Sequence, residues 1–224
     1  MKALWAGCLL LLATTTAPLS GDEILARAGA AQGLSTYSVP VHFEVHMRRP
    51  IGVRSAADAI VYYRTPAQAV LTITKIPGII GRFFKGTYAT ELVPQVWPSK
   101  YNVNSVSQAE LAGVSTFVLH AVPKVDPSVD HVEFTVAQAD ETPLAVAWYY
   151  KNGSTIRLSM ACQTTADYSL VKSETIAVSM PQFSLDATGV YGAYALNAPV
   201  PDSAFPGHAS STLPRRRSTA PAPH

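Results

Sequence analysis

The chain has 224 residues, with 17 Lys and Arg against 15 Asp and Glu, a formal net charge of +2. This length is enough for one domain with a sizeable core. The near-neutral balance gives no electrostatic reason to expect nucleic acid as a partner.

The N-terminus has the layout of a secretory signal peptide. Lys2 precedes the apolar run "ALWAGCLLLLA", and the mostly small or polar run "TTTAPLSG" follows it. The apolar run is too short to span a bilayer comfortably, and no later stretch is long enough for a transmembrane helix. We therefore predict residues 1–21 as a leader, cleaved between Ala17 and Gly21, and a mature chain exported to the periplasm or the extracellular space.

Removal of the leader leaves Cys162 as the only cysteine. A lone cysteine cannot form an internal disulfide, and it cannot build a zinc site without other ligands. We predict that Cys162 is a buried small hydrophobic residue. Cys8 precedes most of the apolar run, which is not the position of a lipid-modified cysteine.

One helix and a series of strands are predicted along the mature chain. The helix covers Gly21–Gly33, with Asp22 as its N-cap and Gly33 at its end. Period-two alternation then dominates and predicts a mostly antiparallel sheet. The strand candidates are Ser38–Arg48, Ala56–Arg64, Ala69–Ile76, Tyr101–Ser107, Val114–Val122, His131–Gln138, Leu144–Tyr150, Ser154–Cys162, Val171–Ser179 and Thr188–Asn197.

The register of one hairpin can be predicted from "LAVAWYYKNGSTIRLSM". A two-residue turn on Asn152-Gly153 would oppose apolar to polar side chains. A three-residue loop, 151–153, pairs Tyr150 with Ser154 and puts Trp148 on the same side as Ile156. Because a one-residue slip moves a whole apolar set to the wrong face, we predict the three-residue loop, with Gly153 in the left-handed conformation.

The segment 75–101 interrupts the strands with two apolar clusters of helical spacing. The clusters are Ile79, Ile80, Phe83 and Phe84, followed by Leu92, Val93, Val96 and Trp97. Gly and Pro residues keep both predicted helices short. Two interpretations remain open: a helical plug that closes the core, or a movable lid over a lipid cavity.

Element order gives the chain a resemblance to a known family. The stretches that carry it are "LSTYSVPVHFEV", "AVAWYYKNGSTIRLSM" and "SLVKSETIAVSMPQFSLDATGVYGAYALN". Over Asp22 to Phe205 the chain resembles the bacterial lipoprotein-carrier superfamily, which comprises LolA/LolB-like proteins, LppX-type lipid carriers and RseB-type sensory domains. No ligand-contact residue of the family is carried over. The chain departs from the family in its Pro-rich tail, and it lacks a lipidated cysteine of the LolB or LppX sort.

The resemblance implies an α+β fold that is mainly β. A strongly curved antiparallel sheet would form an unclosed half-barrel over residues 22–206, with helices covering its concave face and an apolar cavity for acyl chains. Residues 207–224, which include "RRR", are predicted to be a disordered tail.

A second face of the first strand offers a competing chemistry. His42, Glu44 and His46 share that face, and His131 with Glu133 repeats the pattern. Imidazoles and carboxylates bind zinc and other transition metals, so these five residues would form a metal site if their two strands were neighbours. The alternative is cross-strand polar pairing on a solvated convex face, and we predict that no metal is bound.

Motifs of catalysis are lacking: the sequence contains no G-x-S-x-G, no H-E-x-x-H and no phosphate-binding glycine loop. We predict a non-enzyme without a cofactor, monomeric, that carries a lipid or the acyl chain of a lipoprotein and contacts membranes transiently. An envelope sensory or protein-interaction module is the alternative, with an envelope protein as its partner. The predicted cavity and lid residues are Val41, Phe43, Val45, Leu71, Ile73, Ile79, Ile80, Phe83, Phe84, Val96, Trp97, Phe134, Val146, Trp148 and Leu158.

Overall fold

The structure, a computed structural model, describes residues 19–30, 34–50, 52–77 and 86–205. The predicted tail and almost all of the predicted leader lie outside the described residues, as do Ile79, Ile80, Phe83 and Phe84. No helix in these described ranges has both the length and the apolar character needed to cross a membrane.

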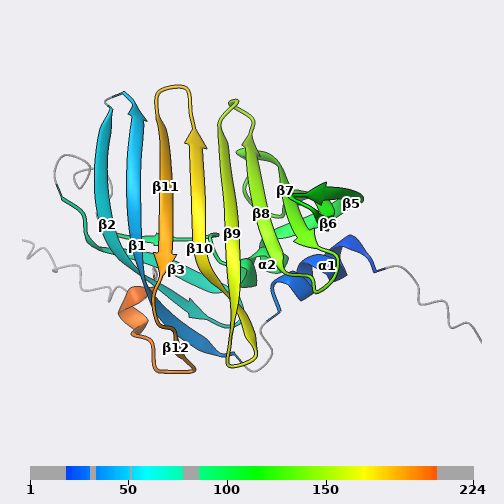
Figure 1. Cartoon of the computed structure of the whole chain (residues 1–224), viewed down its shortest axis with the longest axis horizontal. Helices are drawn as coiled ribbons and strands as arrows, with labels where there is room; N and C mark the ends of the chain where they lie inside the picture. The colour runs from blue at the N-terminus through cyan, green and yellow to red at the C-terminus, as the bar shows by residue number, and fades with distance from the viewer. Residues whose placement is uncertain (1–18, 31–33, 51, 78–85, 206–224) are drawn as a thin grey trace, which may run out of the picture.

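The described strands form one antiparallel sheet in the order β4-β3-β2-β1-β11-β10-β9-β8-β7-β6-β5, with β12 paired to β1 (Figure 1). Their bounds are β1 Thr36–Arg49, β2 Val53–Arg64, β3 Gln68–Lys75, β4 Gly86–Ala89, β5 Tyr101–Leu111, β6 Val114–Pro123, β7 Val129–Ala137, β8 Pro143–Tyr150, β9 Thr155–Thr165, β10 Tyr168–Ser179, β11 Ser184–Tyr191 and β12 Ala195–Leu196. No pairing joins the edge strands β4 and β5 within the described residues, so the sheet is not closed.

The sheet is curved so strongly that one edge passes over the face of its centre. In Figure 1, β3 crosses behind β11 and β10, which stand upright in front of it. Leu71 of β3 lines the same pocket as Trp148 of β8 and Ile156 of β9. These strands are far apart in the sheet order, and therefore the sheet itself covers part of its concave face.

Alternation along each strand fixes which side chains face the concavity. In β1, Tyr37, Val39 and Val41 are at most 2% exposed, whereas the residues between them are more exposed. The β8–β9 hairpin follows the predicted three-residue register: Trp148 opposes Ile156, and the Tyr150 amide donates to the Ser154 carbonyl at 2.9 Å. Gly153 has φ +81°, the left-handed conformation predicted for it.

The first helix, α1 (Gly21–Ala28), is shorter than predicted and its cap is Ser20, not Asp22. The Ser20 hydroxyl accepts from the Glu23 amide and the Glu23 carboxylate accepts from the Ser20 amide, which is a capping box. The Asp22 carboxylate instead accepts from the Val103 amide of β5. Since Ser20 belongs to this cap, leader cleavage near Ala17 would retain the capping box, whereas cleavage at Gly21 would remove it.

The segment between β3 and β5 is not purely helical where it is described. β4 extends the sheet edge, and a 3-10 turn at Pro94–Val96 leads into α2 (Trp97–Lys100). The two α-helices lie beside each other at the β5–β7 end of the sheet, and they contact each other. The predicted helical cover of the concave face is thus not confirmed: among the described residues the two α-helices are short, and both contact β5.

The last predicted strand, Thr188–Asn197, is two strands instead of one. β11 pairs with β1 and ends at Tyr191, and β12 pairs with Tyr37 and Ser38. Between them the Gly192 amide donates to the Pro40 carbonyl at 2.8 Å. Pro40 approaches so closely that a Cβ atom on Gly192 would lie 2.9 Å from Pro40 Cγ, and the strand is interrupted there. A further 3-10 turn, Asp202–Ala204, follows β12.

Candidate ligand-binding site

An open pocket of about 220 Å³ lies in the concave face, and we call it the apolar pocket. All of its lining side chains are hydrophobic: Phe43, Val45, Ala57, Leu71, Ile73, Ile76, Leu92, Ile176, Val178, Leu185 and Ala187. Strands β1, β2, β10 and β11 supply its floor, while β3 and the segment after β4 supply Leu71, Ile73 and Leu92 as its cover. Such a surface can bind a hydrophobic chain but offers nothing for covalent chemistry.

A second pocket of about 380 Å³ adjoins the apolar pocket, and both are lined by Leu71 and Leu92. Its other lining residues are Tyr88, Thr90, Glu91, Tyr101, Asp126, Val129, Trp148, Tyr150 and Ile156. It is more polar than the apolar pocket. The two pockets therefore share leucine side chains as a common border and differ in the polarity of their linings.

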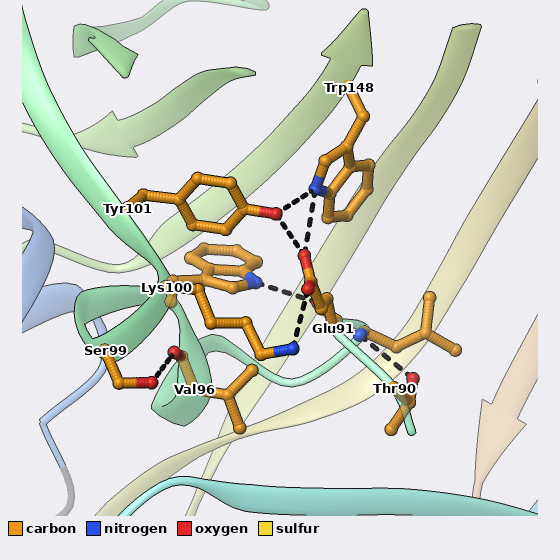
Figure 2. A network of polar contacts seen from close by, with 9 residues as sticks. Thr90, Glu91, Val96, Ser99, Lys100, Tyr101 and Trp148 are labelled. Atoms are coloured by element: carbon orange, nitrogen blue, oxygen red, sulfur yellow. Dashed lines mark hydrogen bonds and ion pairs between the residues drawn. The ribbon is translucent and has the colours of Figure 1, made fainter. Parts of the chain in front are cut away.

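A hydrogen-bond network centred on Glu91 lies at the second pocket (Figure 2). Its carboxylate accepts from Lys100 Nζ at 2.8 Å, from Trp148 Nε1 at 3.2 Å and from the Tyr101 hydroxyl. Trp148 Nε1 also contacts the Tyr101 oxygen at 2.8 Å. Burial is the largest cause that raises the pKa of Tyr101, and the nearby Glu91 carboxylate adds to it. Glu91 thereby ties the segment after β4 to β5 and β8.

Trp97 anchors the same segment to the core. Its indole nitrogen donates to the Glu91 carbonyl at 2.8 Å, and its ring lies 4.8 Å from the ring of Phe134 on β7. Val96 and Trp97 are fully buried. In the described half of the segment predicted as a plug or a lid, these two residues pack as a plug.

The predicted cavity residues separate into two groups. Phe43, Val45, Leu71 and Ile73 line the apolar pocket, and Trp148 lines the second pocket with Leu71. The others that are described are at most 2% exposed and line neither pocket: Val41, Val96, Trp97, Phe134, Val146 and Leu158. The structure thus brings together the residues of β1 and β3, and it places the deeper ones in the packed core.

Glu174 of β10 is a buried acid that the sequence-based site did not include. It is 2% exposed, and neither of its carboxylate oxygens has a hydrogen-bond partner among the described residues. Burial raises its pKa to about 8, and the neighbouring Tyr191 hydroxyl opposes part of that rise. The sequence did contain a signal that Glu174 faces inward: it occupies the same alternate positions of β10 as Ile176 and Val178, which line the concave face.

The predicted polar face of β1 carries ion pairs. His42 Nδ1 lies 2.6 Å from Asp58 on the facing position of β2, and His120 Nδ1 lies 3.3 Å from Glu133 across β6 and β7. Four strands separate β1 from β7, so the condition for a joint site of His42, Glu44, His46, His131 and Glu133 is not met. Within the described residues no group of three or more His, Cys, Asp or Glu could hold a metal ion.

Two arginines of the first two strands, Arg48 and Arg64, are paired in the structure. Arg48 forms an ion pair with Asp186, and Arg64 forms one with Asp202 while its guanidinium lies 4.2 Å from the Phe205 ring centroid. Cys162 forms no disulfide and is only partly buried, less so than predicted, and its thiol donates to the Pro143 carbonyl at 3.7 Å. Burial nevertheless raises the pKa of its thiol.

Comparison with solved structures identifies the fold. A LolA superfamily protein from Nitrosomonas europaea matches with TM-score 0.60 and 12% identity over 84% of this chain and 98% of that one. The chain has the LolA fold. A domain from Vibrio parahaemolyticus named as an outer membrane lipoprotein-sorting protein matches with TM-score 0.60 and 12% identity over 83% of this chain and 96% of that one.

The LolA fold also matches a DUF1329 family protein from Desulfovibrio piger, with TM-score 0.60 and 8% identity over 83% of this chain and 95% of that one. No protein-family model and no curated protein matches the sequence. The likeness lies in the curved sheet that bears the apolar pocket, and the chemistry of that pocket must be judged from this chain's own residues.

Proposed function

We propose that this chain is an exported, periplasmic carrier that binds the hydrophobic chain of a lipid or lipoprotein in the apolar pocket. One observation carries the proposal: the lining of that pocket is wholly hydrophobic, on the concave face of a LolA fold. An open hydrophobic surface is unfavourable in water and is stabilised by a ligand or a partner. Export follows from the predicted leader.

Burial of alkyl groups supplies enough free energy for such a carrier. Each buried CH₂ contributes about 0.8 kcal/mol, so roughly eight methylene groups contribute about 6 kcal/mol before entropy losses. This corresponds to reversible binding, as a carrier requires, and needs no catalytic group. Release would follow from competition by a membrane or a second protein.

A bulky residue in the pocket floor should abolish binding. Ala187 of β11 lines the apolar pocket, so the ring of Ala187→Phe would occupy the space of a ligand. We expect its affinity for an apolar fluorescent probe to fall at least tenfold, as measured by titration, because the probe loses its buried contacts.

The matched control is Thr188→Phe, which places the same ring one residue along β11 on the opposite face of the sheet. Its affinity should stay within about twofold of the original chain. Circular dichroism establishes that both variants fold. Equal affinities for the two folded variants would rule out the apolar pocket as the binding site.

A further inference from the structure

Glu174 lies in a row of residues that crosses the concave face from β1 to β9. Phe43 of β1 faces Gly189 of β11, which faces Glu174 of β10, which faces Met160 of β9. The neighbouring row contains Val45, Ala187 and Ile176, all of which line the apolar pocket. The carboxyl group therefore lies one row beyond the pocket floor.

Phe43 connects the two rows, because it lines the apolar pocket and also lies beside Glu174. A Cβ atom on Gly189 would lie 2.7 Å from Phe43 Cε1 and 3.1 Å from Glu174 Cγ. The missing side chain at Gly189 thus leaves the space that the aromatic ring and the acid share. Phe43 thus borders both the apolar pocket and the space beside the carboxyl group.

Among the described residues, tyrosines surround the acid and no cation is paired with it. Tyr37, Tyr191 and Tyr194 interact with Glu174 electrostatically, and none of the ion pairs among the described residues includes it. The Tyr37 hydroxyl reaches Gln95 at 3.5 Å, and that of Tyr194 donates to the Val171 carbonyl at 2.7 Å.

The Tyr191 hydroxyl is buried and has no hydrogen-bond partner among the described residues. This hydroxyl and the Glu174 carboxyl are close enough to interact with each other, but neither has a hydrogen bond of good geometry to any described residue. Buried polar groups without partners are costly, and their persistence in a fold is typical of a ligand site. Burial raises the pKa of Glu174 to about 8, so the free chain holds this acid largely protonated at pH 7. A ligand group that carries positive charge and donates hydrogen bonds would favour the ionised form, which only accepts them.

We propose that Glu174 and Tyr191 bind the primary ammonium head group of an amphiphile whose alkyl chain lies in the apolar pocket. This inference rests on the proposed carrier function and names the ligand class. An ammonium group donates three hydrogen bonds and balances the negative charge that Glu174 acquires when its proton is released to solvent on binding. A carboxylate head group would find no cation paired with the acid among the described residues, and a hydroxyl head group carries no charge that stabilises the ionised form of Glu174.

The test compares three probes with the same twelve-carbon chain: dodecylamine, dodecanol and dodecanoate, titrated calorimetrically at pH 7 below their aggregation concentrations. We expect the original chain to bind dodecylamine at least tenfold more tightly than dodecanol, and dodecanoate most weakly. In Glu174→Gln the preference for dodecylamine over dodecanol should fall below threefold, while dodecanol affinity changes less than twofold. Glu110→Gln, the same exchange at an exposed position of β5, should retain the full preference.

The other outcomes distinguish failure of the ammonium site from failure of the carrier function. An equal preference in the original chain and Glu174→Gln overturns the ammonium site and leaves the carrier function intact. No binding of any probe to the original chain overturns both. If Glu174→Gln does not fold, the ¹³C resonance of the Glu174 carboxyl in the original chain decides: it should shift on addition of dodecylamine and not of dodecanol, and an unchanged resonance overturns the inference.

Discussion

Replacement of Trp97 by alanine should lower the free energy of unfolding by about 3–5 kcal/mol, the range for removing a buried tryptophan. The indole is fully buried against Phe134, and its nitrogen holds the Glu91 carbonyl, so the variant leaves a cavity and an unpaired acceptor. Urea unfolding at neutral pH measures the loss.

Val125→Ala provides the comparison, because Val125 is 89% exposed and its change should stay within about 0.5 kcal/mol. If Trp97→Ala costs less than about 1 kcal/mol, Trp97 contributes little to the core, and the segment after β4 is a loosely held lid instead of a plug.

The stability of the protein should fall between about pH 5 and pH 8 because of Glu174. Burial raises the pKa of this carboxyl from 4.5 to about 8. The folded chain therefore holds a proton that the unfolded chain has released. The stabilisation from protonated Glu174 is fully present below pH 4.5 and is lost as the pH rises through about 8.

The loss should amount to roughly 1 kcal/mol per pH unit within this window. Glu174→Gln cannot titrate, so it should lack this slope and become the more stable chain at pH 8. Urea unfolding of both chains at pH 5, 6, 7 and 8 measures the difference, with Glu110→Gln as the control for a generic charge change. Parallel curves for the original chain and Glu174→Gln would show that the acid is ionised and satisfied in the folded state.

The sheet could be predicted from the sequence because strands are recognised from a local pattern of side chains. Apolar residues at every second position locate a strand and its inward face, and the same alternation selects the loop around Gly153. Where the rule weakens, prediction was less accurate. β4 is four residues long and, among the described residues, pairs only with β3. The interruption after Tyr191 lies beside Pro40, which is distant in sequence and close to Gly192.

The pocket was predicted only in part, for a related physical reason. Parity shows that Val41 and Phe43 face the same side, but it cannot show that Val41 is covered by the core while Phe43 borders an open space. That difference depends on how far β3 and the segment after β4 reach over the sheet. No local pattern could have predicted the hydrogen-bond network of Glu91, since its partners Tyr101 and Trp148 come from separate strands.

The predicted metal site failed because a local sequence motif does not predict which strands are neighbours in the sheet. His42 and His131 occupy equivalent positions in similar short motifs, yet four strands lie between β1 and β7 in the sheet. Strand order is set by the whole topology, so a repeated motif does not predict proximity. In the structure these two histidines instead contact acidic residues at the surface: His42 contacts Asp58, and His131 contacts Asp130.

The central claim, that the apolar pocket binds an alkyl chain, is tested most directly by methyl NMR of the original chain labelled at Ile, Leu and Val. Addition of dodecylamine or dodecanol should shift the methyl resonances of Ile73, Leu92 and Ile176, which line the pocket, and leave those of Ile60 and Val190 on the opposite face unchanged. Shifts confined to the opposite face, or none at saturating probe, would contradict the claim.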